Sequence, residues 1–144
     1  MIDPLETVIK WLQQDAALSA LAGERIAAKH RYPERVDVSG WSRDDAGLMV
    51  RLDGGIPSLY VALQPIRLEI RCYANSQYLA SRAWQRLVEL SRETERQAVL
   101  TSTGSALLYW FHQSSGPSML HDSQIDLDFI MSFWDALVAE QEIT

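Results

Sequence analysis

Residues 64–90, QPIRLEIRCYANSQYLASRAWQRLVEL, contain two different hydrophobic periodicities in succession. From Ile66 to Tyr73 apolar and polar residues alternate, which is the pattern of a strand with one face buried and the other, that of Arg67, Glu69 and Arg71, in water. After Ser76, leucines and alanines recur every three or four residues, which is the spacing of an amphipathic helix. Asn75 or Ser76 can accept hydrogen bonds from the first free N–H groups of that helix. The stretch predicts a strand followed by a helix that folds back over the apolar face of the strand.

The composition is that of one globular domain, which we place at residues 1–144. The chain has 144 residues, of which 47% are hydrophobic and 22% charged, enough to form a core of ordinary size. No apolar run approaches the roughly 18 residues of a membrane span. The first residues, MIDPLET, lack the basic start and apolar core of a signal peptide. We therefore expect a protein that is made in the cytoplasm and has no membrane contact.

The net charge and the single cysteine argue against two further classes of function. A net charge of −6 does not suit a protein that binds the nucleic-acid backbone, because such affinity rests on clustered lysine and arginine. Cys72 has no second cysteine to pair with. Its place on the apolar side of the predicted strand indicates a small core residue rather than a nucleophile.

The N-terminal third of the chain predicts a helical region and then a long loop. Asp3 and Pro4 are typical of a helix start, and residues 4–22 form either one helix or a helix with a break near Asp15. Residues 29–47 carry many charges and few apolar residues, which predicts a loop. Trp41 is the exception in this loop. It belongs either to the core of the domain or to a contact with a partner, since tryptophan is enriched in such contacts.

The remaining residues predict further strands and connections. Asp53-Gly54-Gly55 is a strong turn signal, the segment 114–118 has the composition of a loop, and residues 134–144 suit either a strand extension or a frayed helix. In the last strand we expect Leu127 and Phe129 to face the core. The fold class is α+β, a mainly antiparallel sheet with two main helices packed on one face. The predicted strands are Leu48–Leu52, Ile66–Tyr73, Leu107–His112 and Ile125–Phe133, and the predicted helices are Pro4–Ala22 and Ser76–Arg92.

No motif of an enzyme is present in the sequence. There is no glycine-rich phosphate loop, cysteine pair, His-Glu-x-x-His or Gly-x-Ser-x-Gly. The run His121-Asp122-Ser123 contains the residue types of a catalytic triad, but adjacent side chains point apart and a triad needs converging ones. Asp126 and Asp128 suit a solvated or subunit-facing edge better than a metal site. We expect no catalytic residue, no metal and no cofactor.

Three short stretches resemble the tail terminator, or tail completion, proteins of long-tailed bacteriophages. The first is the pattern D-x-x-L-x-A-L-x-G-x-R-I, from Asp15 to Ile26. The second is Tyr73-Ala74-Asn75-Ser76, between a strand and a helix. The third is the closing alternating segment IDLDFIMSFW, residues 125–134. The charged stretch 29–47 and the aromatic segment 107–112 depart from the family pattern.

The resemblance implies a structural protein of the virion neck, assembled in the host cytoplasm. Such a protein forms a ring, usually a hexamer, on the last ring of tail tube protein, stops tube growth and offers a surface to the head-tail connector or stopper protein. DNA passes through the lumen without specific binding. The parts that reach furthest from the body are the candidates for subunit or partner contacts. They are Trp41, Arg43, Asp53, Gly54 and Gly55.

Two alternatives remain open at this stage. The chain could serve as another head-tail neck protein, namely a head completion, stopper or adaptor protein. It could also be a small ligand-binding α+β domain with a site between helix and sheet. A pocket with converging polar groups would favour the ligand-binding domain, whereas flat faces suited to a ring would favour assembly.

Overall fold

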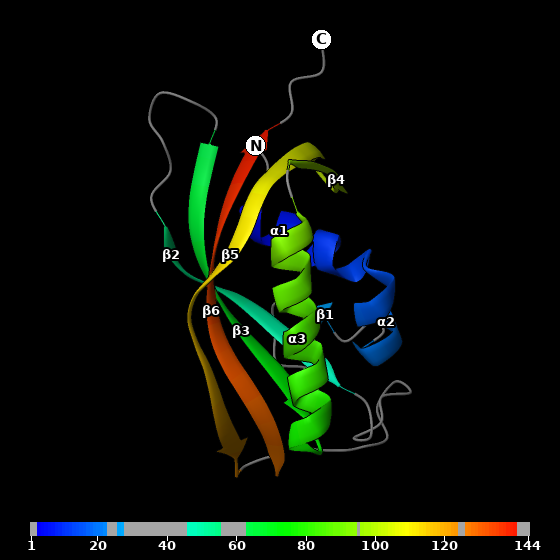
Figure 1. Ribbon diagram of the computed structural model, residues 1–144. Helices are drawn as coiled ribbons and strands as arrows, with labels where there is room; N and C mark the ends of the chain where they lie inside the picture. The colour runs from blue at the N-terminus through cyan, green and yellow to red at the C-terminus, as the bar shows by residue number, and fades with distance from the viewer. Residues whose placement is uncertain are drawn as a thin grey trace.

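The computed structural model describes residues 3–22, 26–27, 46–55, 63–94, 96–123 and 126–140 (Figure 1). Within these ranges the chain forms three helices and one six-stranded sheet. The helices are α1 (Pro4–Gln13), α2 (Ala16–Ala22) and α3 (Gln77–Glu93). The strands are β1 (Ile26–Ala27), β2 (Gly47–Gly55), β3 (Leu63–Ala74), β4 (Gln97–Thr101), β5 (Gly104–Asp122) and β6 (Leu127–Glu140).

The sheet is mainly antiparallel, so the predicted α+β class is confirmed. Its strand order is β1-β2-β3-β6-β5-β4. Only β1 and β2 pair in parallel, and all other neighbours are antiparallel. The strand β6 extends to Glu140, which decides the open question about the C-terminal segment in favour of a strand extension over the described residues.

The predicted N-terminal helix is divided in two, so the described part of the chain has three helices where two were expected. Asp3 caps α1 by accepting a hydrogen bond from the Leu5 N–H at 2.9 Å. Asp15 follows the end of α1, and its carboxylate accepts from the Leu18 N–H at 3.0 Å. A short carboxylate side chain at that position starts a new helix, which explains the break.

One large core joins the three helices to one face of the sheet. Alternate residues of β3, from Ile66 to Ala74, contribute to it together with Leu87 of α3 and Leu12 of α1. At its centre the indole of Trp134 stacks on Phe111, with ring centroids 4.6 Å apart. The strand-helix unit predicted from residues 64–90 is therefore confirmed, and Cys72 is a buried core residue.

The expected orientation of the last strand is wrong. Ile130, Trp134 and Val138 of β6 face the main core, whereas Leu127 and Phe129 belong to a second, smaller buried cluster with Met49 and Tyr73. Both faces of β6 are apolar in this region. Alternation alone could not decide which face the helices cover, because either set of residues suits a buried surface.

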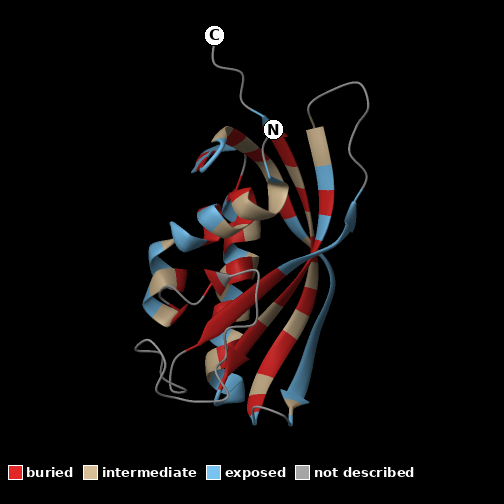
Figure 2. Ribbon diagram, turned by 180° about the vertical axis from the view of Figure 1, so that it is seen from behind, coloured by how far each residue is buried: buried red, intermediate tan, exposed pale blue. Residues whose placement is uncertain are grey.

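Two predicted connections are strand segments. Asp53, Gly54 and Gly55 lie in β2, and Ser114–Ser118 lie in β5. The glycines adopt φ values of +118° and +135°, and the β2–β3 register shifts between Leu52 and Gly55. Glycine in such a conformation makes a bulge inside a strand as readily as a turn at its end. Figure 2 shows much of β5 exposed, which explains its loop-like composition.

Candidate functional site

Of the five predicted contact residues, the structure describes three. Trp41 and Arg43 lie outside the described residues, as does most of the predicted loop 29–47. Asp53, Gly54 and Gly55 lie near the end of β2, where their residues are exposed. An added Cβ at Gly55 would come within 2.5 Å of the Pro65 carbonyl oxygen. The glycine therefore permits a close approach of β2 to β3. It does not form the predicted turn.

The face of the sheet opposite the main core has a distinctive composition. We call it the outer face and define it by alternate residues of three adjacent strands. They are Met49, Arg51 and Asp53 of β2, then Arg67, Glu69, Arg71 and Tyr73 of β3, then Phe129, Met131, Phe133 and Asp135 of β6. Arginines, carboxylates and aromatic rings lie side by side in these rows, at the spacing that allows cross-strand contacts.

Glu69 is the central residue of the outer face. It is only 6% exposed. Its carboxylate forms an ion pair with the Arg51 Nε at 2.9 Å and another with the Arg71 Nη2 at 3.1 Å. Burial lowers the pKa of Arg71, but hydrogen bonds to Tyr73 and Glu69 outweigh it, so that this pKa lies above its ordinary value. Two arginines thus neutralise one buried carboxylate, as a buried charge requires.

The arginines of the outer face also stack on aromatic rings. The guanidinium carbon of Arg71 lies 5.1 Å from the centroid of the Phe129 ring, and that of Arg67 lies 4.9 Å from the centroid of Phe133. Arg67 pairs with Asp53 at 3.4 Å. Contacts of this kind hold a guanidinium flat against the sheet. The outer face is therefore a rigid surface with its charges largely balanced.

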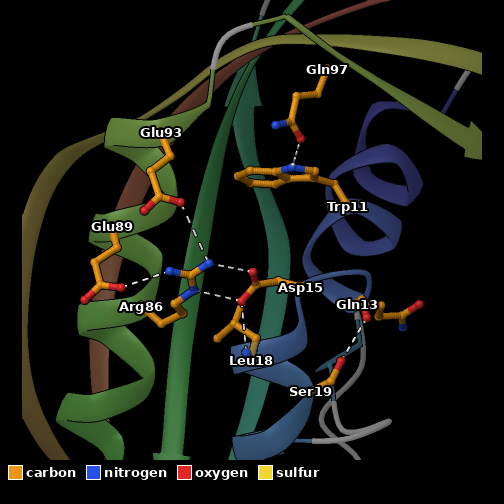
Figure 3. A network of polar contacts seen from close by, with 9 residues as sticks. All are labelled: Trp11, Gln13, Asp15, Leu18, Ser19, Arg86, Glu89, Glu93 and Gln97. Atoms are coloured by element: carbon orange, nitrogen blue, oxygen red, sulfur yellow. Dashed lines mark hydrogen bonds and ion pairs between the residues drawn. The ribbon is translucent and has the colours of Figure 1, made fainter.

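A second polar network ties the helices together on the other side of the sheet (Figure 3). Arg86 of α3 donates two hydrogen bonds to the Asp15 carboxylate in a bidentate contact, from Nη2 at 2.7 Å and from Nε at 2.9 Å. It also donates to Glu89 at 2.9 Å. The hydrogen bonds from Arg86 lower the pKa of Asp15 below its ordinary value. Since Asp15 also caps α2, one carboxylate links the start of α2 to α3.

The tip of the β5–β6 hairpin carries a histidine between two aspartates. The His121 Nδ1 lies 2.8 Å from Asp128, and its Nε2 lies 3.1 Å from Asp126. The hydrogen bond to Asp128, more than any other contact, raises the pKa of His121 above its ordinary value. The run His121-Asp122-Ser123 therefore does not act as a triad here, because the imidazole is engaged by carboxylates on both nitrogens.

The described residues offer little for chemistry. Burial raises the pKa of the Cys72 thiol to about 12, which keeps it protonated and unreactive. In the described ranges, no group of three histidine, cysteine, aspartate or glutamate side chains is placed to hold a metal ion. Over the same ranges, none of the helices is long and apolar enough to cross a membrane.

The ion pairs and ring contacts of the outer face were not predicted from the sequence. Arg67, Glu69 and Arg71 alternate with apolar residues, so they were interpreted as a face in water. The missing signal was in β6. Its segment FIMSFWDALVA is apolar on both faces, which indicates that neither face is simply solvated.

Comparison with known proteins gives a fold likeness. No protein-family model matches the sequence, and no curated protein sequence matches it. Among solved structures, the chain resembles a chain in a structure described as the virion of a native gene transfer agent particle, at a TM-score of 0.57 and 16% sequence identity. The match covers 92% of each chain. At this identity the likeness establishes a shared fold over nearly the whole length of both chains.

Proposed function

We propose that this chain is a structural protein of a phage-like virion, and specifically a tail terminator. It forms a ring, with six copies as the expected number, on the end of the tail tube. The ring stops polymerisation of the tube protein and offers the surface to which the head-tail connector or stopper protein binds. In this role the chain has no catalytic activity and needs no cofactor.

The observation that carries the proposal is the fold likeness to a chain from a virion, which extends over 92% of both chains. The sequence marks from Asp15 to Ile26 and from Tyr73 to Ser76 agree with it, because they resemble tail terminators independently of the fold. The balanced outer face and the net charge of −6 suit a ring through which DNA passes without being held. A ring also needs two different contact surfaces on each copy.

Deleting the gene for this chain tests the proposal. Particles made without it should have filled heads and competent tube protein, but tails of uncontrolled length that fail to join heads. Negative-stain electron microscopy measures the length distribution and the fraction of joined particles. Supplying the wild-type chain from a plasmid should restore both, which excludes an effect on neighbouring genes.

Two outcomes contradict the terminator role. Tails of normal length that are correctly joined would exclude any function in tail completion. Tails of normal length that stay unjoined would instead assign the chain to a neighbouring neck position, as a head completion, stopper or adaptor protein.

A further inference from the structure

The two edges of the sheet are only partly covered by strands of the described chain. At one edge β1 pairs with β2 only at Leu48 and Met49, which leaves residues 50–55 of β2 without a described strand outside them. At the other edge β4 pairs with β5 only up to Leu108, which leaves residues 110–122 in the same condition. The backbone N–H and C=O groups of a strand edge are a template for a strand of another chain.

The two uncovered edges have the right directions to pair with each other between copies. Neighbours in the series β2, β3, β6, β5 are all antiparallel, so β5 runs opposite to β2. Copies in a ring are related by rotation about one axis and keep the same orientation along it. The β5 edge of one copy therefore meets the β2 edge of the next in antiparallel fashion, which is the more stable pairing.

The two edges also match in their position along the strand direction. Leu52 lies in one row of the sheet with Leu68, Trp134 and Gln113, as the registers of the three strand pairs define. A rotation without rise about an axis along the strands thus brings Leu52 beside Gln113 of the next copy. Leu52 is 45% exposed, and a neighbouring strand would cover it.

Hydrogen-bonding groups also match on the outer face at the same position along the strands. Arg67, Asp135 and His112 share a row, and Asp53 pairs with Arg67 at the β2 end of that row. Continuing the row into the next copy places the Asp53 carboxylate beside the His112 imidazole, which can donate a hydrogen bond to it. The His112 ring is stacked on Trp110 at 5.2 Å, so it is held in a fixed orientation.

We propose that residues 112–115 of β5 pair antiparallel with residues 51–53 of β2 in the next copy, joining the sheets around the ring. This inference rests on the proposed ring. The paired segment is short because Pro117 lacks an N–H group and Gly54 begins the bulge in β2. Bulges and a proline next to a pairing edge limit association with other strands, so the contact is restricted to a partner of matching shape.

Disulfide trapping tests this contact in the full-length chain. The double variant Leu52→Cys/Gln113→Cys should give ladders of cross-linked chains when assembled particles or purified oligomers are oxidised and run on a denaturing gel. Within one chain the two positions are three strand spacings apart, about 14 Å, whereas a disulfide needs Cα atoms within about 7 Å. The native Cys72 is buried and does not interfere.

The matched control is Leu100→Cys/Gln113→Cys, because Leu100 is 73% exposed but lies on β4. This control should stay uncross-linked. A second double variant, Leu52→Cys/Met119→Cys, tests the same two edges in a shifted register, so cross-links from it without cross-links from the first variant would overturn the proposed register. If neither test variant gives ladders of cross-linked chains in particles that contain the protein, the proposed contact is overturned. That failure leaves the terminator role intact, since the role is measured separately by tail length in the deletion.

Discussion

At the scale of single residues, Glu69 is the feature that sets the outer face apart from an ordinary solvated sheet. A carboxylate that is almost fully buried would be costly alone, and Arg51 and Arg71 compensate it with ion pairs at 2.9 and 3.1 Å. Arg51 remains 54% exposed, so part of this compensation is screened by water. The cluster nevertheless fixes the positions of two guanidinium groups.

Replacing Glu69 by glutamine should lower the free energy of unfolding by about 1–3 kcal/mol, because two hydrogen bonds to a charged group weaken and two arginines lose their counter-charge. Urea denaturation followed by tryptophan fluorescence measures the change. Asp53→Asn is the control, since its ion pair with Arg67 is exposed on both sides and should contribute less than about 1 kcal/mol. Equal effects of the two variants would show that Glu69 has no special structural role.

How far single residues could be assigned from the sequence depended on their neighbours. Cys72 was assigned to the core because its own strand alternates clearly. Glu69 was assigned to solvent on the same pattern, because its burial depends on Arg51 and Phe133 from two other strands. The sequence of one strand contains no information about what lies across the sheet from it.

At the scale of elements, the link from Asp15 to Arg86 decides how the N-terminal helices sit on α3. The carboxylate accepts two hydrogen bonds from the guanidinium and one from the Leu18 N–H. The low pKa of Asp15 has a direct consequence for stability. A group whose pKa is lower in the folded state stabilises the fold above its unfolded pKa, about 3.9 for aspartate, and this contribution is lost as the pH falls through the folded value.

The variant Asp15→Asn should therefore be less stable than the wild type at pH 7, by about 1–3 kcal/mol. The difference should persist down to about pH 4 and shrink below it. Thermal or urea denaturation of both proteins over a pH series measures this. Glu89→Gln provides the control on the same arginine, because Glu89 is exposed and its loss should cost under about 1 kcal/mol. A difference independent of pH would mean that the charge of the Asp15 carboxylate does not contribute to stability.

Among the elements, those with strong local periodicity were predicted and those with glycine, serine or proline were not. The strand β3 and the helix α3 were located to within a few residues. The ends of β2 and β5 were mistaken for a turn and a loop, because glycine and proline favour turns in general. Both segments lie at sheet edges, where bulges and proline are tolerated. The glycine and proline residues that led to the wrong prediction of a turn and a loop are thus typical of strand segments that no described strand covers.

At the scale of the whole molecule, the described fold separates two kinds of surface. The helices and one sheet face form a closed core tied by Arg86, whereas exposed residues lie along the ends of β2 and β5 that no described strand covers (Figures 1 and 2). A body with distinct edges on opposite sides is suited to ring formation, because each copy can present one edge to each neighbour. The sequence predicted the class of fold but not these edges, which exist only once the strand order is known.

The central claim is that copies of this chain form a ring on the end of a tail tube. A cryo-electron microscopy reconstruction of the particle neck tests it most directly. The account predicts a closed ring of repeated densities between the last tube ring and the head connector, each fitted by the fold described here, with β5 of one copy beside β2 of the next. A neck in which this fold occupies a different layer, or is absent, would contradict it.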